Sequence, residues 1–499
     1  MVMHPDTPSA PGPPMEQRFM SSDTLSVTSS VTSSVTSPVT SSVPSPPTSA
    51  AAAASGPQTG SDIRPGRRSA AQIAEALSDS APRLTATQAL VEAERCLYCF
   101  DAPCMHACPT GIDVPSFIRR IADHNLRGAA RAILSANPLG GTCARACPTE
   151  VLCEQVCVKV AQEDRPVAIG RLQRFATDAV MDQPVTALFT RAAPTGKRVA
   201  VVGAGPAGLT CAFELAKRGH SVVIHDALQR GGGLNEYGLA SYKMAGGFAQ
   251  AEMQWLMGIG GISLQTGWRL MVAPQLDMLR DAFDAVFLGL GLARTPRLGI
   301  AGEDLAGVRD AVTFIAELRQ AVSPAALPVG RRVVVIGGGM TAVDAAVQSR
   351  LLGAEEVHLV YRRGPAQMSA SGDEIEWALK NGVHIHHHLA PVEFIAHADG
   401  QALQAVRFAR TDETSAEDVT LPADTALRAI GQQLDLMALE GSGLRIEGGR
   451  IQADAEGGTG VPGLYVGGDA RAGGRDLTVE AVEDGKRAAI AMHAELTGR

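Results

Sequence analysis

Two glycine-rich fingerprints, each directly after a short apolar run, most strongly limit the folds open to this chain. They are Gly203-x-Gly205-x-x-Gly208 and Gly337-x-Gly339-x-x-Ala342. The first glycine makes a tight turn, the second lets a phosphate approach the backbone, and the third, where alanine is also allowed, lets a helix pack on the strand. The fingerprints predict two separate nucleotide-binding α/β units with parallel sheets.

Size and charge narrow the class of protein. The chain has 499 residues, so we expect two or three domains. Its net charge of −8 and the lack of a basic stripe argue against nucleic-acid binding. No apolar run is long enough to cross a bilayer, so we expect a cytoplasmic protein without a membrane partner.

The first 82 residues differ in composition from the rest of the chain. Ser, Thr, Pro, Val and Ala dominate them, as in the stretch SSVTSSVTSPVTSSVPSP. Such a segment cannot bury enough apolar surface to offset its chain entropy, which predicts a disordered leader over residues 1–82. A transit peptide is the alternative, but it needs regular arginines, and residues 1–62 contain only Arg18.

Eight of the nine cysteines lie between Cys96 and Cys157, in two closely spaced groups. They read Cys96-x2-Cys99-x4-Cys104-x3-Cys108-Pro109 and Cys143-x3-Cys147-Pro148-x4-Cys153-x3-Cys157. Fe–S clusters need soft thiolates from loops, and ferredoxin motifs also end in Cys-Pro. Zinc is the alternative, although zinc ribbons prefer paired Cys-x2-Cys knuckles and only one such pair occurs. The pattern predicts two [4Fe–4S] clusters.

Around these cysteines the sequence predicts short helices. Apolar residues at three- and four-residue spacing predict a helix from Phe117 onward that stops at Asn137-Pro138. We therefore expect an α-helical domain over residues 83–195. The ninth cysteine, Cys211, follows the first fingerprint within a helix and is interpreted as a small packing residue.

The two fingerprints predict different ligands because their second strands end differently. Asp226 ends the strand SVVIHD, where an acid accepts a ribose hydroxyl. Arg362 and Arg363 end the strand VHLVYRR, where guanidinium groups match a 2′-phosphate. The second site therefore favours NADP(H) over NAD(H), unless both arginines are merely solvated charges at a strand end.

Several stretches resemble one family. RCLYCFDAPCMHACPTGIDVPSFI, NPLGGTCARACPTEVLCEQVC and IGRLQRFAT resemble the N-terminal Fe–S domain of dihydropyrimidine dehydrogenase and that of its bacterial PreT-type subunit. The glutamate synthase small subunit is a more distant relative. The likeness runs from about Leu84 to the C-terminus. It implies an NAD(P) domain over residues 293–430, inserted in an FAD domain over residues 196–292 and 431–499.

The resemblance also implies a ligand set for each cluster. The first cluster would take Cys96, Cys99, Cys104 and Cys157, and the second would take Cys108, Cys147, Cys153 and Gln173. Spacing alone nominates Cys143 instead of Gln173, which could be an ordinary polar residue on a helix. An amide oxygen is a harder, neutral ligand and would change the cluster potential.

The family also implies the residues around the dinucleotides. VPGLYVGGDARAGG resembles the segment that contacts the ribityl–phosphate part of FAD, and Lys243 falls where relatives carry a basic residue near the isoalloxazine ring. Leu239-Ala240 replaces the usual Ile-Pro beside it. The predicted FAD residues are Gly203, Gly205, Pro206, Ala207, Gly208, Asp226, Gly232, Gly233, Leu234, Gly468 and Asp469. The predicted NAD(P) residues are Gly337, Gly338, Gly339, Ala342, Arg362 and Arg363.

The expected function is electron input. The chain ends soon after Asp469 without a segment able to house a pyrimidine or glutamate site. The resemblance therefore implies a subunit that passes electrons from NAD(P)H through FAD and two clusters to an FMN/Fe–S partner reducing uracil and thymine. The alternatives are a glutamate synthase small subunit or related reductase and, in another class, a zinc-bearing nucleotide-sensing interaction protein.

Overall fold

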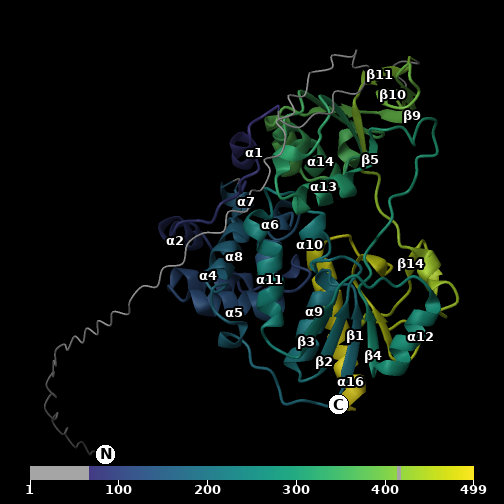
Figure 1. Cartoon of the computed structure of the whole chain (residues 1–499). Coiled ribbons are helices and arrows are strands. Elements are labelled where there is room, and N and C mark those ends of the chain that lie inside the picture. Colours follow the sequence, from purple (N-terminus) through teal and green to yellow (C-terminus); the bar gives the residue numbers. More distant parts are fainter. Residues whose placement is uncertain (1–66, 164, 413–416, 499) are drawn as a thin grey trace, which may run out of the picture. The chain divides into compact units, whose positions relative to one another are not determined.

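The computed structural model describes residues 67–163, 165–412 and 417–498, so most of the predicted leader lies outside the described residues (Figure 1). The end of that leader is not disordered as predicted, because helix α1 (Ala70–Ala76) forms there. Ser69 and Gln72 make a capping box, and Ile73 and Leu77 pack against the core of the second sheet. A helix this short is stabilised by tertiary packing rather than by composition, so the sequence did not reveal it.

The cysteine-bearing region folds into short helices around one apolar core, as expected. The helix predicted from Phe117 to Asn137 is instead two helices, because Asn125 caps a new one by accepting a hydrogen bond from Gly128 N. The helices are α2 (Ala86–Glu94), α3 (Pro103–His106), α4 (Val114–Ala122), α5 (Leu126–Ala136), α6 (Gly140–Ala146), α7 (Lys159–Glu163) and α8 (Ile169–Asp178), with short 3-10 turns η1 (Thr149–Val151) and η2 (Val185–Ala187).

The first fingerprint belongs to a five-stranded parallel sheet, here called the first unit. Its order is β15-β4-β1-β2-β3, so β15, from the C-terminal part of the chain, pairs with β4. The strands are β1 (Arg198–Val202), β2 (Ser221–His225), β3 (Ile262–Gln265), β4 (Ala285–Leu288) and β15 (Leu464–Val466). The chain thus leaves this sheet after β4 and returns to it, as the predicted insertion requires.

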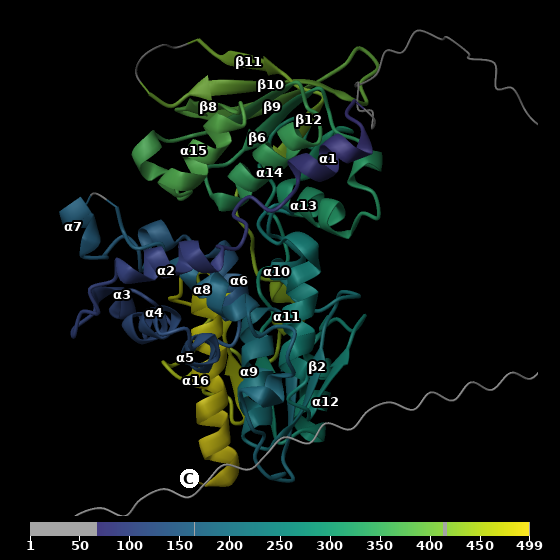
Figure 2. The same cartoon turned by 90° about the vertical axis from the view of Figure 1, so that its left-hand side faces the viewer.

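Helices cover both faces of the first sheet. Buried residues of α9 and α16 pack on one face, and buried residues of α12 pack on the other (Figures 1 and 2). The helices of this unit are α9 (Pro206–Lys217), α10 (Leu234–Tyr237), α11 (Phe248–Met257), α12 (Ala273–Ala282) and α16 (Thr478–Thr497), with 3-10 turns η3 (Ala245–Gly247), η6 (Leu436–Leu439) and η7 (Gly468–Ala470) and a small ribbon of β13 (Ile446–Glu447) and β14 (Arg450–Ile451).

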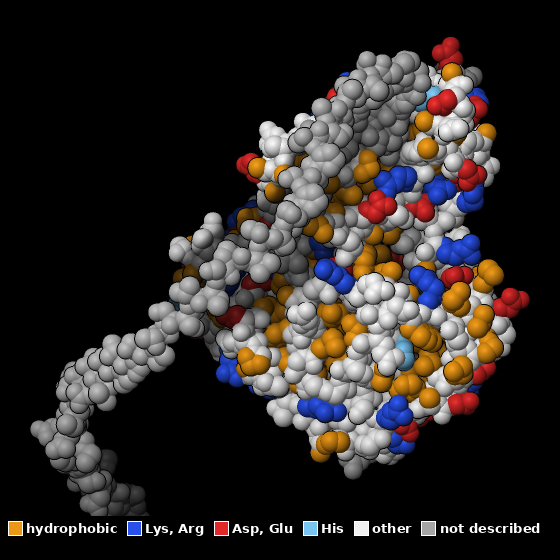
Figure 3. All heavy atoms as spheres, in the orientation of Figure 1, with side chains coloured by type: hydrophobic (Ala, Val, Ile, Leu, Met, Phe, Trp, Pro, Cys, Tyr) orange, Lys and Arg blue, Asp and Glu red, His pale blue; other side chains and the backbone are white. Residues whose placement is uncertain are grey.

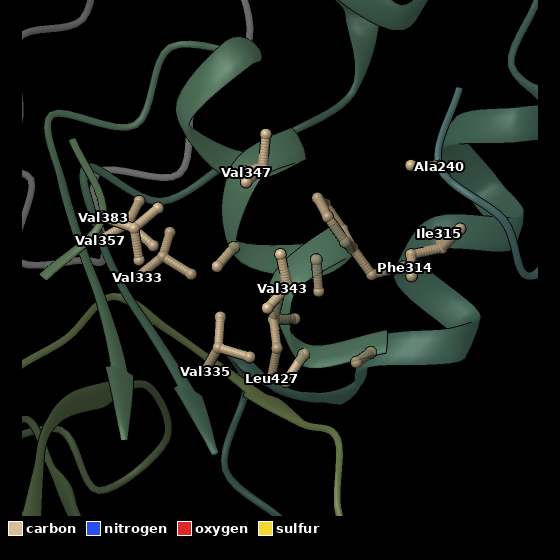
Figure 4. Close-up of a cluster of buried hydrophobic side chains, with 14 of the residues drawn as sticks. Ala240, Phe314, Ile315, Val333, Val335, Val343, Val347, Val357, Val383 and Leu427 are labelled. Carbon is tan, nitrogen blue, oxygen red and sulfur yellow. The ribbon is translucent and has the colours of Figure 1, made fainter. Parts of the chain in front are cut away.

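The second fingerprint belongs to another five-stranded parallel sheet, here called the second unit, with order β5-β12-β6-β7-β8. Val333 and Val335 on β6 pack against Val343 and Val347 on α14 in its core (Figure 4). Its elements are β5 (Val308–Asp310), α13 (Ala311–Gln320), η4 (Pro324–Ala326), β6 (Arg332–Ile336), α14 (Met340–Leu351), β7 (Glu356–Tyr361), η5 (Pro365–Gln367), α15 (Gly372–Lys380), β8 (His384–His387) and β12 (Thr425–Arg428).

A three-stranded antiparallel sheet was not predicted. It has the order β11-β10-β9 and joins β8 to β12 in the chain. Its strands are β9 (Leu389–Ala396), β10 (Leu403–Arg410) and β11 (Val419–Pro422). The predicted domain boundaries stay predictions, although the one at residue 292 falls between the end of β4 and the start of β5.

Basic side chains lie among acidic ones on the face shown in Figure 3. Of the helices that the structure describes, none is long and apolar enough to cross a membrane.

Candidate functional site

The first glycine turn joins β1 to α9 and leaves no room for a side chain at its first and third glycines. Gly203 has φ +104°, and a Cβ there would lie 2.1 Å from Gly289 O. A Cβ on Gly208 would lie 1.9 Å from Gly203 O. Pro206 occupies the first turn of α9, where its missing N–H costs nothing, and the remaining free N–H groups there favour an anion.

Asp226, at the end of β2, closes this turn. Its carboxylate accepts hydrogen bonds from Ala204 N at 2.7 Å and Leu228 N at 2.8 Å. Burial raises the pKa of Asp226, while the two backbone bonds lower it. The predicted acid therefore lies beside the glycine turn. In a dinucleotide site of this kind, the turn binds the pyrophosphate and the acid accepts a hydrogen bond from a ribose hydroxyl.

Two further segments reach the same turn. Gly232 N donates to Ala204 O at 2.8 Å, and a Cβ on Gly233 would lie 2.7 Å from Gly205 Cα. After β15, a Cβ on Gly468 would lie 3.1 Å from Ala207 Cβ. Burial, followed by the charge of Asp476, raises the pKa of Asp469 to about 6. Three segments distant in sequence thus form one bare backbone cradle, which fits the dinucleotide FAD.

The second glycine turn, between β6 and α14, is built in the same way. Gly337 has φ +151°, and a Cβ there would lie 2.2 Å from Ala429 O. A Cβ on Gly338 would lie 2.5 Å from the Tyr361 ring. Gly339 is the N-cap of α14, and Ala342 is buried. This cradle fits a second nucleotide.

Arg362 and Arg363 follow β7 and are exposed. Arg362 O accepts a hydrogen bond from Thr411 Oγ1 at 2.6 Å, and the Arg363 guanidinium lies 5.3 Å from the centroid of the Tyr361 ring. The two side chains lie at the end of the strand where a 2′-phosphate is recognised in such folds. The preference for NADPH stays a prediction.

Four thiols predicted to hold the first cluster line a single cavity together with Leu97, Pro103, Ile118 and Val158. They are Cys96, Cys99, Cys104 and Cys157. Burial, followed by repulsion from Cys96 and Cys157, raises the pKa of Cys104 to about 12. Several buried thiolates so close together would cost free energy through desolvation and mutual repulsion unless cations offset their charge. Iron ions offset it in Fe–S centres.

The thiols predicted for the second cluster lie near Cys143. A hydrogen bond with the Cys143 thiol, and then burial, raise the pKa of Cys147. Burial also raises the pKa of Cys153, and the neighbouring Cys108 raises it further. Cys143, Cys147 and Cys108 pack against Leu477 and Val479 at the start of α16. The second thiol group is therefore in contact with the first unit.

Gln173 lies in the same neighbourhood on α8 and is buried. Its amide nitrogen donates to Gly140 O at 2.7 Å, at the start of the helix that carries Cys143. The choice between Gln173 and Cys143 as the fourth ligand stays a prediction. Within the described residues, no group of three or more His, Cys, Asp or Glu side chains is arranged around a single metal ion.

Lys243 has neighbours that the sequence did not indicate. Its ammonium lies 2.8 Å from Asp344 Oδ1 on α14 and 2.7 Å from Glu374 Oε1 on α15. Burial alone would lower the pKa of Lys243, but these two carboxylates raise it above its ordinary value. The Tyr242 hydroxyl also donates to Asp344, at 3.0 Å. Lys243 thus connects the first unit to the second, and its predicted place beside the flavin ring stays a prediction.

These features define an electron-transfer oxidoreductase that combines a thiolate-rich helical domain with a flavin unit and a nicotinamide-nucleotide unit. Residues 73–185 match the family model "Dihydropyrimidine dehydrogenase domain II, 4Fe-4S cluster". Residues 197–485 match the model "Pyridine nucleotide-disulphide oxidoreductase". The chain belongs to the pyridine nucleotide-disulphide oxidoreductase family, and the predicted cofactor classes, FAD, NAD(P) and 4Fe–4S, are confirmed.

Relatives of known name share most of this chain. It is 33% identical over 425 residues to the NAD-dependent dihydropyrimidine dehydrogenase subunit PreT of Escherichia coli, covering 85% of this chain and 98% of that one. It is 34% identical over 429 residues to the NADP(+)-dependent formate dehydrogenase subunit beta of Moorella thermoacetica, covering 78% of this chain but only 59% of the relative. It is 31% identical to the glutamate synthase [NADPH] small chain of Escherichia coli, covering 81% and 90%. The predicted resemblance is confirmed.

Solved structures support the fold of the two units. The thioredoxin reductase of Lactococcus lactis aligns with a TM-score of 0.50 and 20% identity over 61% of this chain and all of that chain. At that identity the likeness concerns the fold alone, and it confirms the predicted pair of α/β units.

Proposed function

We propose that this chain is the electron-input subunit of a two-subunit dihydropyrimidine dehydrogenase. It would pass electrons from NAD(P)H, through FAD and two [4Fe–4S] clusters, to a separate FMN/Fe–S subunit that reduces uracil and thymine. The observation that carries the proposal is the contact of the second thiol group with Leu477 and Val479 of the flavin-binding unit. This contact would place the second cluster next to that unit, where it could accept electrons.

The residues of the chain bind and orient FAD, NAD(P)H and the clusters, and these cofactors supply the redox chemistry. FAD, when bound, would supply the chemistry that couples a two-electron hydride transfer to one-electron carriers. The glycine turns at Gly203 and Gly337 hold the two dinucleotides, and Arg362 and Arg363 select NADPH. Cys96, Cys99, Cys104 and Cys157 hold the first cluster. Cys108, Cys147, Cys153 and Gln173 hold the second.

The identity of the electron acceptor rests on the relatives. PreT carries dihydropyrimidine dehydrogenase in its name and is matched over 98% of its length. The glutamate synthase small chain is matched over 90% of its length, so glutamate synthesis is the second candidate. The names of these two relatives point to different electron acceptors, so an assay must decide between them.

The first experiment counts the clusters. Protein purified without oxygen should be brown and contain about eight iron and eight sulfide per chain, as two [4Fe–4S] clusters require. Gln173→Ala should lose about half of both, whereas Cys143→Ala should retain them. Loss of a cluster in Cys143→Ala would instead make Cys143 the fourth ligand. A colourless protein with stoichiometric zinc contradicts the proposal.

The second experiment identifies the acceptor. Protein co-purified with its partner is given NADPH or NADH and either uracil, thymine, or 2-oxoglutarate with glutamine. Dihydropyrimidine formation is the expected result. Glutamate formation without pyrimidine reduction would replace the proposal with its alternative.

A further inference from the structure

Helix α11 touches both the predicted flavin turn and the helix that carries the second thiol group. On one side, Gln250 Nε2 donates to Gly231 O at 2.7 Å. Met253 packs so closely there that a Cβ on Gly231 would lie 2.6 Å from its sulfur. Gly231 immediately precedes the Gly232-Gly233 pair that packs on the first glycine turn. This side of α11 is therefore fixed to the flavin cradle.

The other side of α11 is fixed to α6 by Glu252, whose residue is only 1% exposed. Its carboxylate accepts hydrogen bonds from Gly141 N at 2.8 Å, from Thr142 N at 3.1 Å and from the Thr142 hydroxyl. A Cβ on Gly141 would lie 2.5 Å from the Phe248 ring and 2.7 Å from Glu252 Oε1. The two helices can approach this closely only because residue 141 has no side chain.

Arg145 of α6 lies at the contact between α6 and α11. The Arg145 guanidinium lies 3.4 Å from the centroid of the Phe248 ring, and it donates to Gly141 O at 2.9 Å and to Asp178 Oδ1 at 2.7 Å. Burial raises the pKa of Glu252 to about 7, although the bonds from Thr142 and the charge of Arg145 lower it. A buried carboxylate is costly unless its hydrogen bonds are satisfied, so this arrangement holds α6 in one place.

The position of α6 decides where the second thiol group lies. Cys143 is within α6, and Cys147 follows its last turn. Gln173 donates to Gly140 O, the first residue of the same helix. The positions of Gln173 and Cys143, the two candidates for the fourth ligand, and of the predicted ligand Cys147 thus depend on α6.

We propose that Glu252 is a positioning residue that fixes α6, and with it the second Fe–S cluster, at a set separation from the flavin. It touches neither cofactor site itself and acts through the backbone of Gly141 and Thr142. This inference rests on the proposed function, since it requires a cluster at the second thiol group.

The test compares Glu252→Ala with Glu252→Gln in the full chain. Alanine leaves three donors on α6 without an acceptor, so α6 loses its attachment to α11. Glutamine can still accept from both backbone N–H groups, and its amide can donate to the Thr142 oxygen. Electron transfer is followed optically after photoreduction of the flavin, and the second cluster is followed by its EPR spectrum and midpoint potential.

We expect Glu252→Ala to slow flavin-to-cluster transfer about tenfold or more, because small misplacements of reacting groups have large effects on rate. Its EPR signal from the second cluster should broaden. Glu252→Gln should restore the rate to within about twofold of the unaltered protein. Thr142→Val, which removes only the hydroxyl donor, should have a smaller effect than Glu252→Ala and provides the measurement if that variant does not fold.

Glu303 offers a matched control. It is also buried, accepts from Leu298 N at 2.6 Å and Gly299 N at 2.9 Å, and pairs with Arg428, but it lies in the second unit. Glu303→Ala should lower the melting temperature without changing the transfer rate after photoreduction.

Two outcomes separate the inference from the proposed function. An unaltered protein without a second cluster would contradict both. If two clusters are present and Glu252→Ala keeps the normal rate and EPR spectrum, or if glutamine restores nothing, only the positioning role is wrong.

Discussion

The two glycine turns of this protein exclude side chains in the same way but have different surroundings. In the first, a Cβ on Gly203 would meet Gly289 O at 2.1 Å, and in the second, a Cβ on Gly337 would meet Ala429 O at 2.2 Å. In both, a residue after a neighbouring strand supplies the blocking carbonyl. The fingerprint is therefore a requirement of the backbone, set by close packing between adjacent strands.

The turns differ in what stands beside them. Asp226 accepts a hydrogen bond from Ala204 N in the first turn, whereas the Tyr361 ring lies against Gly338 in the second. The third glycine also differs, because Gly208 approaches Gly203 O too closely for a side chain while Ala342 is accommodated in the core. The comparison teaches that the same close packing recurs in both turns, whereas the residues at the end of the second strand differ, and the choice of ligand is predicted to depend on that difference.

The largest expected effect comes from filling each turn. Gly203→Ala should cost about 3 kcal/mol or more and abolish FAD binding, because it combines φ +104° with a clash against Gly289 O. Gly337→Ala should leave the flavin absorbance intact and abolish oxidation of NAD(P)H. Flavin content, melting temperature and single-turnover reduction separate the two results.

The matched control is Gly400→Ala. Gly400 also has a positive φ, +74°, but a Cβ there would meet nothing within 4 Å. This change should cost only about 1–2 kcal/mol, from the backbone conformation alone, and leave both cofactor sites functional. If Gly203→Ala behaves like Gly400→Ala, close packing does not define the first turn.

The second effect concerns the ends of the second strands. Replacing Arg362 and Arg363 together by glutamine should raise KM for NADPH about tenfold or more while KM for NADH changes little, because charge-assisted bonds to a 2′-phosphate are lost. The melting temperature should stay almost unchanged, since both side chains are exposed. Equal effects on the two nucleotides would show that these arginines do not read the phosphate.

The smallest effect concerns the starts of the same strands. His220, before β2, is fully buried between Thr195 and His493, whereas Glu355, before β7, is exposed. Burial, followed by the charge of His493, lowers the pKa of His220 to about 4. The unfolded chain therefore binds a proton near pH 6.5 that the folded chain does not, so the stability due to neutral His220 is present above that pH and is lost as pH falls towards 4.

His220→Gln tests this pH dependence. Its melting temperature should lie further below that of the unaltered protein at pH 7.5 than at pH 4.5, by about 2–4 °C. His384→Gln, in the exposed start of β8, should show no such trend. A gap that widens in acid would contradict the assigned direction.

Sequence patterns predicted the elements well where the requirement is local. The apolar runs before Gly203 and Gly337 are strands, and the helices expected around the cysteines are present. The patterns failed where the answer depended on packing. Helix α1 forms because Ile73 and Leu77 pack against the core of the second unit. The antiparallel sheet β9–β11 departs from the alternating strands and helices that the sequence predicted.

The candidate sites divide in the same way. The spacing of the cysteines indicated two groups, but spacing alone could not pair Cys157 with Cys96, and the resemblance supplied that pairing. The structure lines one cavity with both. The partners of Lys243 and Glu252 carried no signal in the sequence, because Asp344 and Thr142 are each about a hundred residues away.

By itself, the sequence determined the local chemistry of this protein: two glycine turns, an acid and an arginine pair at strand ends, and thiols close enough in the chain to share loops. These follow from backbone geometry and ligand type, which act over a few residues. Only the tertiary structure decided which segments meet. It brought Gly468 to Ala207, Leu477 to Cys143 and Glu252 to α6, because such contacts depend on how sheets and helices pack and not on neighbouring residues.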